Sequence, residues 1–246
     1  MNKYRADLHI HTVLSPCGGL EMSPIKIIEK AVKKGISIIG ITDHNTTRHC
    51  NLIRKLAEPA GIFTLMGAEV TTREEVHCLS FFENDDQLSD FQLYLEKYII
   101  RIPNDPEKFG FQVVVDENEL IIDDIEFLLI SALDQSLEQV EQKVHSLGGI
   151  FIPAHIDRPS FSIISQLGFI PDNLQIDGIE ISANCKKDSV LPFIGQHNTK
   201  SFIRSSDAHY ADQVGKTFST FEIEHCSFNE IKMALQGSSG RNVTIA

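Results

Sequence analysis

Short apolar runs alternate along the chain with segments of helical periodicity. Runs of strand length predict strands at residues 4–10, 36–41, 62–66, 77–82, 150–152, 178–181 and 202–203. Apolar residues three and four positions apart predict helices at 25–34, 49–57, 88–101 and 136–146, and a last helix from residue 227. A strand-then-helix order is typical of an α/β fold with parallel strands and right-handed crossovers.

Several helix ends carry strong local signals. Ser23 followed by Pro24 is a preferred start, because Ser caps the free N–H groups and Pro fits the first helical position. Gly35 is well placed to end this helix in the left-handed conformation. Ser227 and Glu230 have the spacing of a capping box.

The middle of the chain differs from this alternation. Residues 109–122 hold two β-rich runs around the acidic turn 116–119 and predict a hairpin. We expect the hairpin to belong to a small excursion at about 103–135, which would act as a lid over a ligand. The whole chain, 1–246, is expected to be a single domain, because α/β barrels reach this length as one unit.

Composition limits which kinds of binding partner and which cellular compartment we expect for this chain. The hydrophobic fraction of 42% allows a sizeable core, and the net charge of −12 disfavours duplex nucleic acid and anionic membranes as partners. The five cysteines are scattered without a Cys-x-x-Cys pair and predict reduced thiols. With no apolar signal core at the N-terminus and no membrane-spanning apolar run, a cytoplasmic location is expected.

Ligand-type residues gather just after the apolar runs. Side chains two apart on a strand share one face, so the two histidines of a His-x-His pair can enter one pocket. In a barrel-like α/β fold, the carboxyl ends of the strands collect such residues at one end. Six of the ten histidines lie in these motifs, which are Asp7-Leu8-His9-Ile10-His11, Thr42-Asp43-His44, Gly67-Ala68-Glu69, Glu75-Val76-His77, Pro153-Ala154-His155 and Ser206-Asp207-Ala208-His209.

The conjunction of these motifs favours a metal centre. A lone His-x-His or Thr-Asp-His is more often an ordinary polar strand end. Burying so many imidazoles in one cleft without a metal would leave poorly satisfied polar groups, and imidazole with carboxylate suits zinc or manganese. The remaining histidines are expected at the surface: His49, His145, His197 and His225.

With these motifs the sequence resembles the PHP (polymerase and histidinol phosphatase) superfamily of metal-dependent phosphoesterases, over nearly its whole length. It looks closest to the stand-alone bacterial members. The resemblance implies a distorted seven-stranded (β/α) barrel, here with a small β-hairpin insertion, and three divalent ions of zinc, manganese or iron. It also points to Glu69, Asp207 and His209 as the catalytic residues.

The resemblance also implies which residues share each metal. The first set is His9, His11, Glu69 and Asp207; the second is Glu69, His77 and His155, with Glu69 as the bridge; the third includes His44 and His209.

The third set departs from the family pattern. Many members read HTxxSDG, in which the acid is a ligand of the third metal, but here Ser15 is followed by Pro16 and Cys17. Glu21 is the nearest carboxylate and is assigned to the third metal. Cys17 is the other candidate, although a small buried thiol is its simpler interpretation. Asp43 could itself be a metal ligand, but we expect it to orient His44 or another ligand from behind.

Two arginines are candidates for substrate binding. Arg158 lies three residues after His155, where a guanidinium can hold a phosphate through two hydrogen bonds; a surface ion pair is the alternative. Arg73 lies between Glu69 and His77 and competes for this role.

The expected charge of the centre favours an anionic substrate. Three divalent cations outweigh the carboxylates of Glu21, Glu69 and Asp207, so a phosphate dianion is favoured over a neutral amide. We therefore expect hydrolysis of a small phosphomonoester by metal-bound hydroxide, with a nucleotide such as a nucleoside 3′,5′-bisphosphate or a short oligonucleotide as substrate. The alternatives are a histidinol-phosphate phosphatase, a non-catalytic metal-binding PHP module and a metal-dependent C–N hydrolase.

Overall fold

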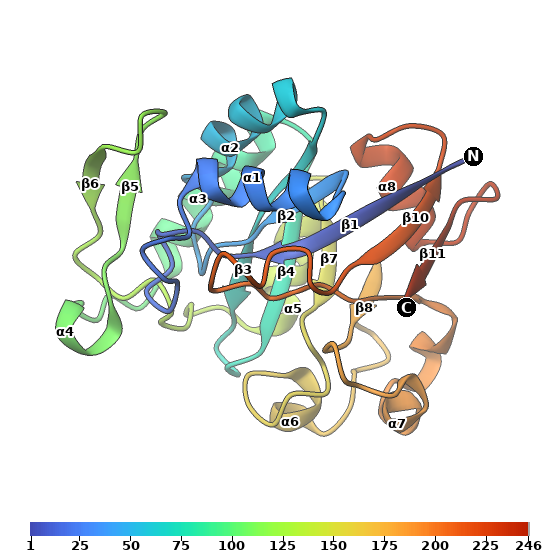
Figure 1. Cartoon of the computed structure of the whole chain (residues 1–246). Helices are drawn as coiled ribbons and strands as arrows, with labels where there is room; N and C mark the ends of the chain where they lie inside the picture. The colour runs from blue at the N-terminus through green and yellow to red at the C-terminus, as the bar shows by residue number, and fades with distance from the viewer. Residues whose placement is uncertain (246) are drawn as a thin grey trace.

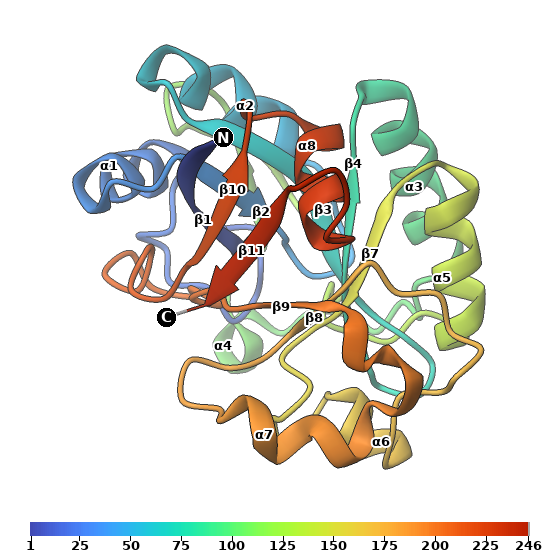
Figure 2. The same cartoon turned by 90° about the vertical axis from the view of Figure 1, so that its right-hand side faces the viewer.

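The computed structural model describes residues 1–245 and is built around one curled sheet of seven strands (Figures 1 and 2). Its strand order is β11-β10-β1-β2-β3-β4-β7. The bounds are Asn2–Ile10 for β1, Ile38–Ile41 for β2, Phe63–Thr71 for β3, His77–Phe82 for β4, Ile150–Pro153 for β7, Ser219–Ile223 for β10 and Asn242–Ile245 for β11.

The sheet is mixed, which corrects the expectation of parallel strands throughout. Only β1, β2 and β3 run parallel to one another, whereas β4 is antiparallel to β3, β7 to β4, β10 to β1, and β11 to β10. The strand β3 runs on to Thr71, which lies opposite His77, the first residue of β4. The connection 72–76 is therefore a hairpin turn, because a parallel crossover needs a dozen or more residues.

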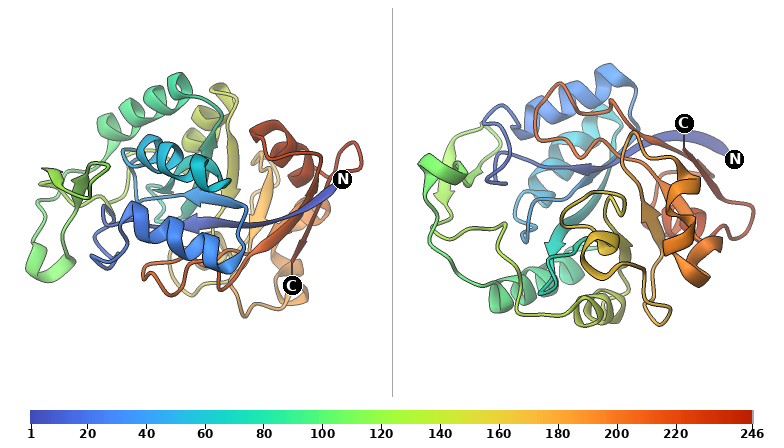
Figure 3. Two further views of the ribbon diagram at one scale, coloured as in Figure 1. Left: turned by 45° about the horizontal axis from the view of Figure 1, so that its top comes forward. Right: turned by 90° about the horizontal axis from the view of Figure 1, so that it is seen from below.

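A second, two-stranded sheet lies between the two edges of the curled sheet. It pairs β8 (Gly178–Glu180) in parallel with β9 (Ser201–Ile203). The strand β8 contacts β7, and β9 contacts β11, so the pair bridges the gap that the curled sheet leaves open (Figure 2). Seen from below, the strands and their connections form a ring (Figure 3). The wall is a distorted, mixed barrel with helices around it, and the seven (β/α) units that the resemblance implies remain a prediction.

Most longer helices cover the outside of the sheet. They are α1 (Pro24–Lys34), α2 (Cys50–Ala57), α3 (Asp85–Tyr98) and α5 (Leu137–Ser146), while α8 (Phe228–Leu235) packs on the inner face. Shorter helical turns are α4 (Pro106–Phe109), α6 (Ile163–Leu167), α7 (Lys187–Val190), η1 (Glu58–Ala60), η2 (Leu191–Phe193) and η3 (Gly195–Thr199). Among the described residues, no helix combines the length and apolar character needed to cross a membrane.

The predicted helix ends are largely present. The Ser23 hydroxyl accepts a hydrogen bond from the Lys26 amide, and Gly35 ends α1 with a φ of 67°. Ser227 caps α8, but the expected capping box is incomplete. The Glu230 carboxylate accepts instead from the amide of Glu224 and from the guanidinium of Arg241.

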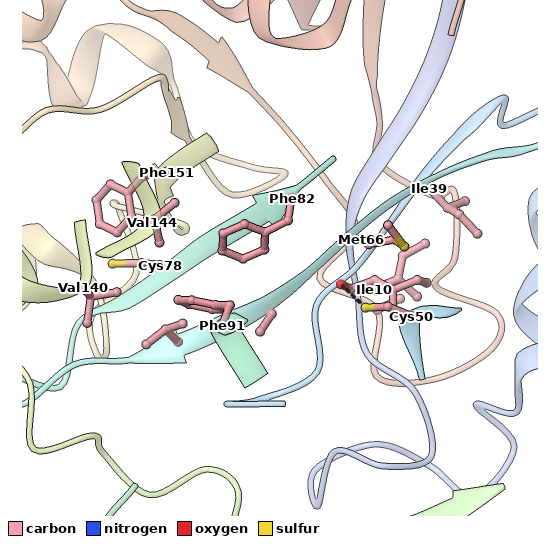
Figure 4. Packing of buried hydrophobic residues seen from close by; sticks show 14 of the residues in the cluster. Ile10, Ile39, Cys50, Met66, Cys78, Phe82, Phe91, Val140, Val144 and Phe151 are labelled. Carbon is pink, nitrogen blue, oxygen red and sulfur yellow. Dashed lines mark hydrogen bonds between the residues drawn. The ribbon is translucent and has the colours of Figure 1, made fainter. Parts of the chain in front are cut away.

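The core forms two layers because alternate side chains leave opposite faces of each strand. In the outer layer, residues such as Ile39, Met66 and Phe82 pack against the covering helices (Figure 4). The rings of Phe82 and Phe91 lie 4.5 Å apart between centroids and join β4 to α3. The inner layer fills the hollow of the barrel, and its members include Leu8, Ile38, Leu65, Phe81, Phe221, Ile231 and Leu235.

The predicted hairpin is present and projects from the body of the molecule (Figure 1). It pairs β5 (Val113–Val115) with β6 (Ile121–Asp124) in antiparallel fashion. At its base, Val113 and Val115 pack against Val13, and the Val115 amide donates to His49 Nε2 over 3.1 Å. His49 is thus buried beneath the hairpin, contrary to the surface position expected from the sequence. The lid function of this segment remains a prediction.

Candidate metal centre

Six of the predicted ligands come together at one end of the barrel because of how the strands are directed. His9 and His11 lie at the carboxyl end of β1, and His44 and His155 follow β2 and β7. His77 begins β4, but β4 runs in the opposite direction, so its amino end lies at the same edge. Glu69 lies within β3, opposite Leu79, and forms a parallel bridge with His44.

A backbone contact adds the last motif to this edge. The His11 amide donates to the Ala208 carbonyl over 3.0 Å, and the Ala208 amide donates to the His9 carbonyl over 3.2 Å. Ala208 is thereby fixed against the end of β1, with Asp207 and His209 on either side of it in the chain. Residues almost two hundred positions apart in sequence are joined by this short bridge.

Glu69 is the hub of the cluster. Its carboxylate is buried, and each of its oxygens is surrounded by imidazole nitrogens from several strands. A carboxylate with so many ligand-type neighbours has the placement of a bridge between metal ions. The distances from ring nitrogen to the nearest Glu69 oxygen are 3.3 Å for His9, 3.3 Å for His11, 3.1 Å for His44, 2.9 Å for His77 and 3.1 Å for His155.

Asp207 is a second carboxylate beside the same histidines. Its Oδ1 lies 3.4 Å from Nε2 of both His9 and His11, and 3.5 Å from Nδ1 of His209. Its Oδ2 forms an ion pair with the guanidinium of Arg158. Asp207 therefore links the first predicted ligand set to the positively charged side chain proposed for phosphate binding.

Partners behind the rings fix which nitrogen faces the centre. His9 Nδ1 lies 3.0 Å from the Glu180 carboxylate, which can only accept, so His9 carries its proton on Nδ1. His209 Nδ1 lies 2.9 Å from the Asp207 carbonyl, which requires the same tautomer. With Nδ1 engaged, Nε2 is the nitrogen that each ring can offer to a metal, and in His9 it lies 3.2 Å from His11 Nε2 and 3.3 Å from the Glu69 carboxylate.

Asp43 positions a further ring, that of His11, through the hydroxyl of Ser15. The Ser15 hydroxyl donates to Asp43 over 2.6 Å and accepts from His11 Nδ1 over 3.0 Å. Asp43 also accepts from the amide and the hydroxyl of Thr12, both over 2.7 Å. Its carboxylate thus orients His11, rather than His44, and holds the turn that follows β1.

The electrostatics of the cluster is a balance between burial and opposite charges. Burial opposes ionisation of Glu69, but the surrounding histidines outweigh it and hold the pKa of Glu69 well below its usual value. Burial also opposes protonation of His11, yet hydrogen bonds to Asp207 and Glu69 raise its pKa to about 9. Burial and the positive charge of neighbouring His11 lower the pKa of His209 to about 4.

These residues fit divalent cations. Among residues 1–245, His44 Nδ1, His77 Nε2 and His155 Nδ1 are buried ring nitrogens without a hydrogen-bond partner, which is rare for buried polar groups, and of the three His44 Nδ1 is the one that faces Glu69. Ligand atoms within 4.8 Å of one another form three histidine-containing groups around the centre. They are His9, His11 and Glu69; His44, Glu69 and His77; and His11, Cys17, His44 and His209.

The third group contains Cys17 and does not contain Glu21. The Glu21 side chain is exposed, and its Oε1 accepts a hydrogen bond from the Ala211 amide over 3.1 Å. The structure therefore leaves the carboxylate that we assigned to the third metal outside the cluster, while the Cys17 sulfur lies within it. The sequence could not resolve this choice, because loop geometry decides which side chain turns inward.

The two candidate arginines differ in position. Arg158 lines a cavity of about 180 Å³ beside the centre, together with His155, Glu180, Ser205 and Asp207. Arg73 lies in the turn between β3 and β4, where its guanidinium forms an ion pair of 2.8 Å with Asp134. The structure therefore brings Arg158 to the centre and holds Arg73 in a surface ion pair.

Two ligand candidates hold an unusual backbone. His155 and Asp207 have positive φ angles of 27° and 48°, a region that costs a non-glycine residue free energy. Such strain persists where the surroundings impose it and is concentrated at functional sites. Here the Ala208 bridge and the amide of His155, which donates to Glu180 over 3.0 Å, fix both conformations.

Glu180 is the residue that sequence reasoning missed. It is buried at the carboxyl end of β8, and its Oε2 accepts from both His9 Nδ1 and the His155 amide. It has no histidine beside it in the sequence, so no motif marked it. Its position near the end of the strand predicted at 178–181 was the only available signal.

Comparisons with known proteins agree with this geometry. The PHP domain family model matches residues 7–147, more than half of the chain. The uncharacterized protein YqxK of Bacillus subtilis (strain 168) is 24% identical over 277 aligned residues, which cover 99% of this chain and 64% of YqxK.

Solved structures show the same fold. The lesion-specific endonuclease PfuEndoQ from Pyrococcus furiosus superposes with a TM-score of 0.77 and 22% identity, covering 98% of this chain and 58% of that chain. A structure of endonuclease Q in complex with a 27-mer duplex substrate, with an abasic lesion at the active site, gives a TM-score of 0.72, 21% identity, and coverage of 98% and 58%. This chain thus spans less than two thirds of the length of these relatives.

Proposed function

We propose that this chain, which belongs to the PHP domain family, is a metal-dependent phosphoesterase that acts on a nucleotide or a short oligonucleotide. The observation that carries the proposal is the placement of Glu69, whose two oxygens lie within 3.3 Å of nitrogens from five histidines. This arrangement supports a centre of up to three divalent ions. When bound, such cations supply water activation and neutralise charge on a phosphate.

The side chains around the centre support an anionic substrate. Arg158 lies at the wall of the cavity beside the centre, and its partner Asp207 is also a predicted metal ligand. When a cation neutralises Asp207, the guanidinium becomes available to a phosphate oxygen, which it can hold through two hydrogen bonds. Arg158 would then orient the phosphate while Glu69 and Asp207 hold the cations.

The cavity itself supports a leaving group of modest size. Its volume of about 180 Å³ is below that of a typical pocket for a whole drug-sized ligand, so it would enclose one part of the substrate. Ser205 lines the cavity, and its buried hydroxyl has no hydrogen-bond partner among the described residues. A sugar hydroxyl or base of a nucleotide would satisfy this group.

Cleavage of damaged duplex DNA is the second candidate. It is favoured by the likeness to endonuclease Q, whose structure holds a duplex with an abasic lesion at the active site. The net charge of −12 opposes it, because affinity for duplex DNA rests largely on cationic contacts to phosphates. The small-substrate proposal is therefore preferred for this chain.

A parallel assay separates the candidates. Phosphate release would be measured from nucleoside 3′,5′-bisphosphates, short oligonucleotides, sugar phosphates and histidinol phosphate, each with Mn²⁺, Zn²⁺, Fe²⁺ or Mg²⁺. A labelled duplex with one abasic site and an N-acyl amide would be tested beside them. We expect turnover of nucleotide substrates by the wild-type protein.

Glu69→Gln is the control variant, because it keeps the side-chain volume and removes the charge that bridges metals. We expect it to lower bound metal and bring hydrolysis to near background. Strand cleavage at the abasic site without turnover of small substrates would select the second candidate. Ordinary activity and full metal content in Glu69→Gln would contradict the proposed centre.

A further inference from the structure

We propose that Cys17 is a thiolate ligand of the third metal, where it replaces the carboxylate of the family motif, and that it makes this position selective for zinc. The ligand set is Cys17, His44 and His209. The proposal deepens the metal centre on which the proposed function rests, but its tests read metal binding and thiol reactivity, not turnover.

The loop that carries Cys17 is held tightly over the centre. The Gly18 amide donates to the Ser15 carbonyl over 2.9 Å, and the Gly19 amide donates to the His209 carbonyl over 2.8 Å. A Cβ atom at Gly18 would lie 2.6 Å from the Thr12 carbonyl oxygen, so only glycine allows the loop to fold back this closely. The turn therefore carries the sulfur toward the histidines that end β1 and follow β9.

Three histidine side chains lie near the Cys17 sulfur. Ligand atoms of Cys17, His11, His44 and His209 lie within 4.8 Å of one another. His11 uses Nδ1 on Ser15, so its one remaining nitrogen is shared with Glu69 and Asp207 in the first ligand set. Cys17, His44 and His209 are left as three protein ligands. Three ligands leave an open position at a tetrahedral ion, as in catalytic zinc sites.

The position in the motif explains why a thiol can stand in for an acid. In the family pattern HTxxSDG the acid follows the serine directly, and here Pro16 occupies that position, so Cys17 comes one residue later. The nearest carboxylate, Glu21, is engaged with the Ala211 amide and is exposed. Cys17 is therefore the anionic ligand that this loop presents to the third group.

Sulfur changes the metal that the site prefers. Thiolate is a soft ligand and selects zinc over manganese or magnesium, which prefer oxygen. A coordinating thiol is deprotonated by the metal, so it contributes one negative charge as an aspartate would. The first two sets contain carboxylate and imidazole only. The centre is thus built to hold a zinc ion at the Cys17 position beside metals that tolerate oxygen ligands.

Cobalt substitution gives the first test. Metal-free protein would be titrated with Co²⁺ and followed for the near-ultraviolet charge-transfer band of a thiolate–cobalt bond. We expect this band in the wild type and in Glu21→Gln, and its loss in Cys17→Ser. Cys17→Asp should lose the band but keep the bound metal, with a preference moved from zinc toward manganese. A Co²⁺-loaded wild type without the band would overturn the proposal.

Alkylation gives the second test, because Cys17 is the exposed thiol among the five cysteines. Cys50, Cys78 and Cys185 are buried, and Cys226 is half-buried, so they serve as internal references. In metal-free protein, the rate at which iodoacetamide modifies Cys17 would be read by peptide mass spectrometry. One equivalent of zinc beyond the carboxylate-bridged sites should slow this reaction at least tenfold. Equal rates at full zinc loading would contradict sulfur ligation.

Discussion

Arg158 lies where the predicted phosphate position meets the metal ligands. Its guanidinium is about half exposed and pairs with Asp207 beside the cavity. The sequence favoured Arg158 for the phosphate contact, with Arg73 as its competitor, and the structure places them differently, because Arg73 is held by Asp134 in the turn after β3. This pair supplies a matched test of the phosphate contact.

We expect Arg158→Ala to lower kcat/KM for phosphomonoesters by roughly ten- to a hundredfold, since a charge-assisted bidentate contact is worth about 1.5–3 kcal/mol. Arg158→Lys should recover part of the loss, because a point charge does not reproduce the planar fork. Metal content should stay near that of the wild type. Arg73→Ala is the control and should be as active as the wild type; a loss in this variant alone would move the phosphate contact to the turn.

Glu180 acts on the centre from behind the ligands. Its Oε2 accepts from His9 Nδ1 and from the His155 amide, so one carboxylate orients residues of two predicted ligand sets. Loss of a partner of this kind typically weakens metal binding by 10–100-fold.

Glu180→Leu should therefore weaken metal binding by about this factor, measured by competition with a chelator. Glu180→Gln should bind more tightly than Glu180→Leu, because its amide oxygen still accepts from the His9 ring. If the two variants release metal equally, the hydrogen bond to His9 does not position the ligand.

At the scale of elements, the sequence predicted helix ends correctly where one residue type, such as a capping serine or a terminal glycine, determines where the helix begins or ends. The helix α1 begins after Ser23, at Pro24, and ends at Gly35 as predicted, since capping and a left-handed end depend only on the nearby backbone. The direction of β4 was missed because it depends on the length of β3, which extends past the predicted end at residue 66 to Thr71. The strands β10 and β11 were also missed, because their stability comes from pairing with β1 and with each other.

For the candidate site too, the sequence predicted some residue positions and missed others. Ligands that lie in His-containing motifs came together, since strand ends carry them to one edge. His49 and His197 were expected at the surface and are buried, because their partners, Val115 and Pro171, come from distant segments. No pattern local to a histidine records such a partner.

A histidine of α5 joins this helix to the segment before β8. His145 Nε2 lies 3.0 Å from Asp177 Oδ2, and Nδ1 contacts Glu141. The hydrogen bond to Asp177 outweighs burial and, together with Glu141, raises the pKa of His145 above its usual 6.5. Because the folded pKa is the higher one, the stabilisation is fully present below about pH 6.5 and is lost as pH rises through the folded pKa.

His145→Gln should therefore lower Tm more at pH 6 than at pH 9. The two differences should differ by roughly 2–4 °C, the shift that about 1 kcal/mol produces in a domain of this size. Thermal melts of metal-free protein at both pH values would measure this. The exposed His225 supplies the comparison, since His225→Gln also removes an imidazole beside carboxylates but at the surface, and its effect on both melts should be smaller than that of His145→Gln. A loss that grows toward pH 9 would reverse the sign of this argument.

At the scale of the whole molecule, the candidate metal centre brings together segments that are not all hydrogen-bonded to one another in a single sheet. Its predicted ligands extend from His9 to His209, and the β8–β9 pair beside it bridges the two edges of the curled sheet through packing. Cations held there would connect β1, β2, β3, β4 and β7 to the segment after β9. Metal binding should therefore stabilise the closed barrel and not only the loops around the centre.

We expect removal of metals with a chelator to lower Tm and re-addition of zinc or manganese to restore it. A ligand at 100 times its Kd stabilises the folded state by about 2.7 kcal/mol per site, which for a domain of this size corresponds to roughly 5–10 °C. Glu69→Gln should show most of its loss of Tm in the metal-loaded state, because it breaks the bridge between two ligand sets. Cys17→Ser should lose only the increment that zinc adds at the third position. Identical melting of the metal-free and metal-loaded wild type would show that the clustered histidines do not hold cations in the folded protein.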